Sequence, residues 1–417
     1  MMLRIVDNEA GVEPFQQSLD ELVREGARRM LMTALDAEVA AYIERHAGER
    51  DERGRRLVTR NGRAYERRIT TGAGTLPIEA PRVRDRGLNE DGTARRFTSK
   101  ILPPYMRQSP KVTEVLPLLY LRGLSTGDFT EALPVLLGED AAGLSASAIT
   151  RLTNTWTSEY ENFCRRDLSE TDYVYVWADG IHFRVRLEED RLCTLVMIGV
   201  RSDGTKELLA VQDGYRESEA SWAAMLRDLT RRGMRPPVLA TADGALGFWA
   251  ALSNVWPQTK QQRCWVHKLA NVLDKLPKRV QPRAKSMLHE VMNASTKNHA
   301  LDASAEFERE FSAKYPKATT CLTKDLPELL TFYEFPAEHW RHIRSTNAIE
   351  SSFATVRLRQ RVTKGAGSRM KALTMAFKLL EMAQKRWRKI NGHWLLNDVQ
   401  DEDVTYVDGV KLEVDAA

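Results

Sequence analysis

The amino-acid sequence predicts an α/β chain, in which a mixed-sheet core is interrupted by an all-helical insertion and preceded by a mainly helical, basic region. Between residues 172 and 276, β-branched and aromatic runs alternate with amphipathic segments in the order three strands, helix, strand, helix, strand, helix. From 277 to 341 the apolar residues recur only at helical spacing. Before residue 169, helical patterns flank an arginine-rich stretch with turn residues.

The core runs predict one sheet with an antiparallel side and a parallel side. YVYVWADGIHFRVRL, LCTLVMIGV and the strand after the Asp203-Gly204 turn follow one another closely, as in an antiparallel meander. The strands that end near Asp243 and Cys264 each follow a helix, which is typical of parallel strands. This element order is that of a ribonuclease-H-like core.

The elements outside the core are predominantly helical. Residues 16–45 predict one or two amphipathic helices, and 56–86 predict short strands and turns that present a basic ribbon. Residues 109–166 predict three helices, the last two capped by Ser125 and Ser145, as in a helix-turn-helix whose last helix enters a major groove. Two further helices are expected at 347–361 and 369–390, and the acidic tail after 391 is expected outside the core. The predicted domains are the N-terminal helical and basic ribbon region (1–108), the helix-turn-helix (109–168), the first part of the core (169–276), the helical insertion (277–341), the second part of the core (342–390) and the acidic tail (391–417).

The net charge of +5 over 417 residues conceals two strongly basic blocks. Residues 53–111 contain 15 basic and 5 acidic side chains, and residues 341–390 contain 13 basic and 2 acidic ones. The segments 1–52 and 391–417 each carry a net charge of −6. Each basic block suffices to neutralise several phosphates, which predicts nucleic-acid binding, although a solvated basic surface is the alternative. The acidic ends could also cover the basic blocks until DNA displaces them.

Several protein classes are excluded by composition. No apolar stretch reaches the roughly 18–20 residues that span a bilayer, so no membrane association is expected. The first residues turn acidic at once and predict no signal peptide. The four cysteines are scattered, which suits a reducing compartment. We therefore expect a cytoplasmic bacterial protein associated with the nucleoid.

Three carboxylates form the candidate catalytic set. Asp179-Gly180 and Asp243-Gly244 each close a predicted core strand, and ligands of open α/β sheets gather beyond the carboxyl ends of strands. Glu350 begins a helix inside the second basic block. Three such carboxylates suit two Mg²⁺ (or Mn²⁺) ions, which can assist an in-line phosphoryl displacement.

Each of these residues also has a plain structural interpretation. Asp-Gly is a common turn, and Glu350 could be a carboxylate favoured by the helix dipole or an ion-pair partner of Arg357. Asn347, Glu350, Arg357 and Arg361 follow helical spacing and share roughly one face. Basic side chains on that face would lie near the phosphates of the substrate.

The successive motifs resemble those of the Mutator-type bacterial insertion-sequence transposases. ADGIHFRVR, TADGALGFW, QQRCWVHKLANVL and STNAIESSFATVRLRQR resemble the catalytic region, and RNGRAYERRITTGAGTLPIEAPRVRDR and LYLRGLSTGDFTEALPVLLG resemble the N-terminal region. The resemblance covers about residues 15–390. It implies a catalytic Asp-Asp-Glu set at Asp179, Asp243 and Glu350, which would also bind the metal ions. Ser345 replaces the first of two threonines usual in the last motif, and His182 is at a variable position.

Cys264 and His267 admit two interpretations. Cys-x-x-His can be half of a structural zinc site, but the sequence offers no second half. The resemblance implies instead that His267 lies near the active site, touching DNA or supporting the catalytic set, and that Cys264 gives structural support at the strand end. Trp340, just before the second basic block, is a candidate to stack on a distorted base.

The predicted function is a DNA transposase that binds the terminal inverted repeats of an insertion sequence, cleaves the 3′ ends and transfers them into target DNA. A homodimer is expected, since two ends must be held together. The alternatives are a metal-dependent, structure-specific nuclease or resolvase on the same core, and a non-catalytic DNA-binding regulator. The predicted DNA contacts are Asn347, Arg357, Arg359, Arg361 and Lys364 in the second basic block, Arg60, Arg63, Arg67, Arg68, Arg82 and Arg84 in the first, and Arg151 in the last helix of the helix-turn-helix.

Overall fold

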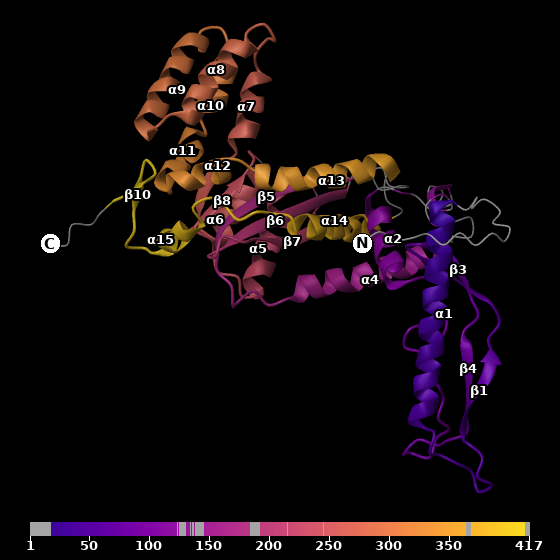
Figure 1. The fold of residues 1–417 in the computed structure, drawn as a ribbon. Helices are drawn as coiled ribbons and strands as arrows, with labels where there is room; N and C mark the ends of the chain where they lie inside the picture. Colours follow the sequence, from indigo (N-terminus) through magenta and orange to yellow (C-terminus); the bar gives the residue numbers. More distant parts are fainter. Residues whose placement is uncertain are drawn as a thin grey trace, which may run out of the picture. The chain divides into compact units, whose positions relative to one another are not determined.

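A computed structural model of the chain divides into two compact units, Met1–Ile149 and Thr150–Ala417. The described residues are 18–122, 124, 131–133, 135, 137, 146–183, 192–214, 216–244, 246–363 and 368–412. Figure 1 labels the helices and strands. Among the described residues, no helix is both long and apolar enough to cross a membrane.

The first unit is built on one long helix, α1 (Leu19–Arg45), where the sequence predicted one or two. Ser18 starts it with a capping box: the Glu21 N–H donates to the Ser18 hydroxyl, and the Ser18 N–H donates to the Glu21 carboxylate. One apolar face of α1 packs on the strands that follow. The small core so formed contains Leu35, Ile69, Leu76, Ile78 and Leu102.

The predicted basic ribbon of the first unit forms two antiparallel strand pairs. β1 (Val58–Arg63) pairs with β4 (Pro81–Asp85), and β2 (Arg67–Thr71) pairs with β3 (Gly74–Ile78). Helix α2 (Pro110–Arg122) follows. The described part of the second helix predicted for the helix-turn-helix is limited to a few residues, so that motif stays a prediction.

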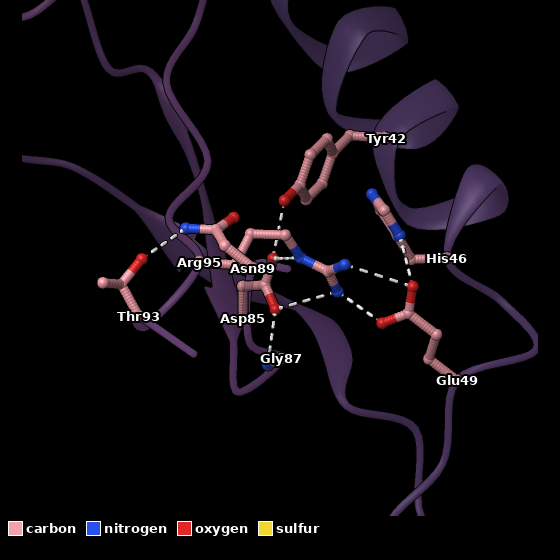
Figure 2. Close-up of polar contacts among 8 residues, drawn as sticks. All are labelled: Tyr42, His46, Glu49, Asp85, Gly87, Asn89, Thr93 and Arg95. Atoms are coloured by element: carbon pink, nitrogen blue, oxygen red, sulfur yellow. Dashed lines mark hydrogen bonds and ion pairs between the residues drawn. The ribbon is translucent and has the colours of Figure 1, made fainter. Parts of the chain in front are cut away.

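A polar network, drawn in Figure 2, joins the end of α1 to β4. The Arg95 guanidinium donates to the carboxylates of both Asp85 and Glu49. The Tyr42 hydroxyl donates to Asp85 Oδ2 (2.6 Å), and the Gly87 N–H donates to Asp85 Oδ1 (2.8 Å). Asp85 is buried, and these donors supply the hydrogen bonds that a buried carboxylate requires.

The second unit contains a five-stranded mixed sheet with the order β7-β6-β5-β8-β9. The β6 strand pairs antiparallel with β5 and β7, while β8 pairs parallel with β5 and β9. The predicted antiparallel and parallel sides are therefore confirmed. The strands are β5 (Tyr173–Phe183), β6 (Leu192–Arg201), β7 (Lys206–Gly214), β8 (Leu239–Ala242) and β9 (Lys260–Arg263).

Helices cover both sides of this sheet, with α5 and α13 on opposite sides in Figure 1. On one side, Val176 and Ala178 of β5 belong to a core cluster with side chains of α5 and α6. On the other side, the Trp177 indole N–H donates to the carbonyl of His342 (3.1 Å). Asp179 alternates with Ala178 along the strand and so shares the face of Trp177. The helices are α5 (Glu219–Arg231), α6 (Leu246–Val255), α7 (Trp265–Leu273), α13 (Asn347–Thr363) and α14 (Arg369–Gln384).

Helix α4 (Ala146–Arg165), predicted as the recognition helix of the helix-turn-helix, packs on the sheet unit from Thr150 onward. The Tyr160 hydroxyl donates to the Val211 carbonyl (2.8 Å), and its ring lies 5.6 Å from that of Phe377 on α14. Arg151 is exposed. One face of α4 is thus buried in the second unit.

The stretch 277–341 is described throughout and contains no strand, as predicted. It consists of short helices between β9 and α13. Figure 1 shows α8, α9 and α10 together at one end of this unit. The elements are α8 (Gln281–Asn293), α9 (Lys297–Phe311), α10 (Pro316–Thr323), α11 (Leu326–Leu329), η1 (Thr331–Glu334), η2 (Ala337–His339) and α12 (Trp340–Ile343).

The prediction that the chain after residue 391 lies outside the core is wrong for 391–412. Leu396 is fully buried, and Tyr406 is 6% exposed. Asp408 Oδ1 accepts a hydrogen bond from the Lys297 N–H (2.6 Å). Apolar side chains and satisfied carboxylates hold this segment on the second unit. Its elements are η3 (His393–Leu395), α15 (Leu396–Gln400), β10 (Tyr406–Val407) and β11 (Val410–Lys411).

Candidate active site

Asp179 and Asp243 lie at the same edge of the sheet. Ala178 of β5 pairs with Ala242 of β8 in the parallel ladder, so each aspartate is one residue beyond this pair. The Gly180 N–H donates to Asp179 Oδ1 (2.8 Å). The Trp249 indole donates to the Asp243 carbonyl (2.7 Å), which holds the turn after β8. The prediction that Asp179-Gly180 closes its strand is wrong, because β5 continues to Phe183 in the antiparallel ladder with β6. The two aspartates share this edge because the parallel ladder of β5 and β8 ends one residue before them.

Burial raises the pKa of Asp179 to about 7, and the negative charge of Asp243 adds to this effect. Glu217 acts in the same direction, whereas His267 and the Gly180 N–H lower the pKa of Asp179. Like charges at one sheet edge disfavour simultaneous ionisation. A divalent cation relieves such repulsion, so this edge has the electrostatics of a cation site.

Glu350 lies in the first turn of α13 and is held by Thr346 and His267. The Thr346 hydroxyl donates to Glu350 Oε1 (2.9 Å), and His267 Nε2 lies 3.5 Å from the same oxygen. The segment before α13 is fixed to the sheet because the Thr241 hydroxyl donates to the Ile343 carbonyl (2.7 Å). Glu350 is therefore positioned by the ends of the same parallel strands that carry the aspartates.

Cys264 connects the starts of α7 and α13. Its own N–H donates to the Ala242 carbonyl (2.8 Å), next to Asp243. Its sulfur accepts from the Thr346 N–H (3.3 Å) and lies 3.2 Å from the Thr346 hydroxyl oxygen. These contacts place Cys264 where β8, α7 and the start of α13 meet.

His267 carries a raised pKa of about 9. The contact with Cys264 contributes most, and the charges of Glu350 and Asp179 add to it, against the opposing effect of burial. The imidazole is thus protonated at neutral pH and lies where its charge acts on both carboxylates. His267 thus contacts Glu350 and lies within the electrostatic influence of Asp179.

Glu217 is a fourth carboxylate at this edge that the sequence did not reveal. A Cβ at Gly180 would lie 2.5 Å from Glu217 Oε1, and His182 Nε2 lies 3.3 Å from that oxygen. Burial and then the charge of Asp243 raise the pKa of Glu217. In the sequence, Glu217 looks like any acidic residue before a helix. Its place in the site becomes visible only in the structure, where its carboxylate packs against Gly180.

Two donor clusters have ligand atoms within 4.8 Å of one another: Cys264–His267–Glu350 and His182–Cys193–Glu217. Among the described residues, the three predicted ligands do not gather as closely as these clusters. The structure instead brings Asp179 to Asp243 and Glu350 to His267. Carboxylate oxygens from two neighbouring parallel strands and a helix are the donor type that Mg²⁺ and Mn²⁺ prefer, so the residues present fit such ions.

The exposed face of α13 carries most of its predicted DNA contacts. Asn347, Arg357 and Arg361 are exposed. Arg359 is only 3% exposed, and its Nε lies 3.5 Å from the sulfur of Met375 on α14, which corrects its assignment as a DNA contact. Its helical position turns it toward α14. Lys364 lies outside the described residues.

Several arginines of the first basic block are engaged within the first unit. Arg60 and Arg63 both form ion pairs with Asp36 of α1. Arg67 donates to the carbonyls of Leu102 (3.4 Å) and Pro103 (3.3 Å). These contacts join sequence-distant residues, so the sequence could not show them. The remaining predicted contacts of the ribbon, Arg68, Arg82 and Arg84, have exposed side chains.

Trp340, the candidate for base stacking, is part of an aromatic cluster in the insertion. Its ring lies 4.9 Å from that of Tyr333 and 5.3 Å from that of Phe332. Its indole N–H donates to the Phe335 carbonyl (2.9 Å). In the structure, Trp340 therefore packs within the insertion, and its contacts need no stacked base to explain them.

The fold and this edge define an α/β protein with a carboxylate-rich site at the carboxyl ends of parallel strands. The family model described as "Transposase, Mutator family" matches residues 5–389. The transposase of insertion sequence IS6120 from Mycolicibacterium smegmatis is 59% identical over 285 residues, covering 68% of this chain and 88% of that one. The transposase of IST2 from Acidithiobacillus ferrooxidans is 51% identical over 258 residues, covering 62% and 87%.

The chain therefore belongs to the Mutator family of transposases, as the sequence motifs predicted. Proteins of this class cut DNA and transfer strands. The similarity extends to the transposase of IS256 in transposon Tn4001 from Staphylococcus aureus, with 26% identity over 362 residues, 84% of this chain and 88% of that one. Among solved structures, a simian T-cell lymphotropic virus intasome chain matches at 13% identity with a TM-score of 0.17, covering 46% and 61%, which is too low to bear on the fold.

Proposed function

We propose that this chain is a DDE-type transposase whose ribonuclease-H-like core uses Asp179, Asp243 and Glu350 to hold two Mg²⁺ or Mn²⁺ ions. The observation that carries the proposal is the pairing of Ala178 with Ala242, which sets both aspartates at one sheet edge. Glu350 of α13 supplies the third carboxylate, which Thr346 and His267 hold by their contacts to its Oε1. When bound, the ions supply charge stabilisation for the attacking and leaving oxygens of a phosphoryl displacement.

The residues of the chain have distinct parts in this reaction. The three carboxylates hold the ions at this edge of the sheet. His267 keeps the Glu350 carboxylate in place, and its raised pKa keeps it cationic in the ion-free site. Arg357 and Arg361 bind phosphates of the substrate beside Glu350. Water would first cleave the phosphodiester at the element end, and the 3′-OH so released would then attack a target strand at the same site.

The recognition of the element ends is assigned to the N-terminal basic region and the predicted helix-turn-helix. Exposed arginines there, such as Arg82 and Arg84, suit contacts to phosphates. A homodimer would hold the two terminal inverted repeats together while both are processed. The same basic surfaces would receive the target DNA.

The test separates end binding from chemistry. We expect Asp179→Asn, Asp243→Asn and Glu350→Gln each to reduce Mg²⁺-dependent cleavage and strand transfer at least 10³-fold, on the order of 4 kcal/mol, while retaining affinity for a duplex carrying the terminal repeat. The exposed Glu306→Gln on α9 is a control that retains activity. Near-parental cleavage by any of the three variants would refute its role.

The same assay distinguishes the alternatives. A structure-specific nuclease or resolvase would cut branched DNA without preference for the repeat sequence. A non-catalytic regulator would bind DNA equally in EDTA and would not cut it in Mg²⁺.

A further inference from the structure

A basic groove of about 630 Å³ lies between α7 and α10, next to the proposed catalytic edge. Its lining includes Gly244, which directly follows Asp243, and four lysines from the two sides. Lys268 and Lys275 come from α7 and the turn after it, while Lys317 and Lys324 come from α10 and its end. The helical insertion therefore supplies one wall of a groove that begins at the catalytic edge.

The charge of this groove is only partly compensated. Lys268 is 5% exposed, and its ammonium group pairs with Asp325 and donates to the Cys321 carbonyl (2.9 Å). The other three lysines are exposed, and within the described chain their ammonium groups have no ion-pair partner. The lining therefore keeps three unneutralised positive charges, which attract an anionic ligand.

The start of α10 adds to this positive character. Tyr315 precedes the helix without a side-chain cap, and no acidic residue lies in its first turn. Lys317 instead occupies that turn, where the helix dipole disfavours a cation. An anion next to Lys317 would be favoured by both the ammonium group and the helix end.

Arg263 provides a second, independent sign of a ligand at the mouth of the groove. Its side chain is buried (8% exposed), and its Nε and Nη1 have no hydrogen-bond partner. Its guanidinium carbon lies 4.8 Å from the centre of the Trp249 ring. Nη1 would lie 3.8 Å from a Cβ at Gly244, so a buried guanidinium with two nitrogens free of hydrogen bonds lies beside the lining of the groove. Buried charges without partners are costly and suggest a ligand.

We propose that this groove, which we name the α7–α10 groove, binds the phosphates of the DNA segment that adjoins the scissile phosphate. The proposal rests on the proposed function, since it takes the edge of Asp243 as the catalytic site. Several cations lining one open groove suit a phosphodiester backbone, which carries one negative charge per nucleotide. The helical insertion then contributes to DNA binding, because it supplies Lys317 and Lys324 to the substrate path.

The test measures DNA affinity in EDTA, where no cleavage occurs. Two duplexes are compared, one that ends at the cleavage position and one that continues for about 20 bp beyond it. The variant is Lys317→Glu/Lys324→Glu. The control is Lys278→Glu/Lys285→Glu, which reverses two exposed lysines of the same insertion that do not line the groove.

We expect the groove variant to bind at least one of the duplexes at least tenfold more weakly than the control variant, with a slope of log K against log [salt] that is smaller by about 2. A loss confined to the longer duplex would locate the flanking DNA in the groove, and a loss on both would locate the element end there. Lys317→Gln/Lys324→Gln should show a smaller loss of the same kind, with an unchanged melting temperature.

Affinity and salt dependence equal to those of the control on both duplexes would overturn the proposal. This outcome is distinct from failure of the proposed function, which is judged by cleavage in Mg²⁺ with the carboxylate variants. A groove variant could lose affinity even if those carboxylates proved dispensable, in which case the groove would serve DNA binding alone.

Discussion

At the scale of single residues, the proposed catalytic carboxylates are placed where their charges oppose folding. Asp179 is largely buried within β5, where the parallel ladder with β8 ends, and it faces the charge of Asp243; its pKa of about 7 reflects both effects. The pKa of Glu217 is raised by the same two causes, of which burial is the larger. A site that concentrates like charges lowers the stability of the folded protein, and a bound cation would relieve this repulsion.

We predict that Asp179→Asn stabilises the protein in EDTA above neutral pH. The folded pKa of Asp179 lies above its ordinary value of 3.8, so its stabilising contribution is present below about pH 4 and is lost as the pH rises to about 7. Asparagine does not titrate. At pH 8 the variant should melt roughly 2–8 °C higher than the parent, on the basis of about 1–2 kcal/mol.

The pH dependence and the effect of Mg²⁺ check this interpretation. The difference in melting temperature should shrink toward pH 4.5, and Mg²⁺ should raise the melting temperature of the parent more than that of the variant. A variant that melts below the parent at pH 8 in EDTA would contradict the proposed charge repulsion.

At the scale of elements, the sequence predicted which segments form the core because their periodicities are strong. The β5 and β6 runs are nearly continuous in buried residues, and the Asp203-Gly204 turn between β6 and β7 is recognisable in the sequence. The parallel placement of β8 and β9 follows from the helices that precede them. Asp243 directly follows β8 as the sequence predicted, whereas β5 continues past Asp179 to Phe183, so the Asp179-Gly180 pair did not mark a strand end.

The contacts around Glu350 could not be predicted in this way. Thr346 and Cys264 are 82 positions apart, and their hydrogen bonds depend on how the insertion returns the chain to the sheet. The pairing of Asp36 with Arg60 and Arg63 is likewise set by how α1 packs on its strands. Charge counts along the sequence do not distinguish a cation facing solvent from one that a carboxylate already neutralises.

The junction of α7 and α13 yields a prediction at this scale. Cys264→Ala removes the sulfur that accepts a hydrogen bond from the buried Thr346 N–H. The free energy of unfolding should therefore fall by about 1–2 kcal/mol more than when a buried thiol that accepts no such hydrogen bond is removed. Cys321→Ala is the matched control, since Cys321 is also buried and free. Urea unfolding should show the larger loss for Cys264→Ala, together with reduced cleavage because Glu350 is less well held.

Equal losses for the two cysteine variants would show that the sulfur contact does not hold α13. Unchanged cleavage by Cys264→Ala would separate the stability of the junction from the positioning of Glu350.

At the scale of the whole molecule, the acidic and basic segments of the sequence are not separated from each other in the fold. Part of the acidic N-terminal segment neutralises the first basic block, as Asp36 and Glu49 show with Arg60, Arg63 and Arg95. Residues 391–412 of the C-terminal acidic segment are instead packed on the second unit. Ion pairs therefore neutralise part of the first basic block, while other basic surfaces, such as the face of α13 and the α7–α10 groove, stay exposed.

This arrangement predicts that the C-terminal segment contributes stability and does not merely cover DNA-binding surfaces. Deleting 391–417 removes Leu396 and Tyr406 from buried positions and leaves their apolar partners exposed. We expect a marked fall in melting temperature, and Leu396→Ala alone should cost about 2–5 kcal/mol. Val410→Ala, at a position of the same segment that is 66% exposed, is the control and should leave the melting temperature nearly unchanged. If the 391–417 deletion instead preserved the melting temperature and raised non-specific DNA affinity at low salt, the segment would act as a cover, because a residue that stabilises the fold cannot be removed without cost.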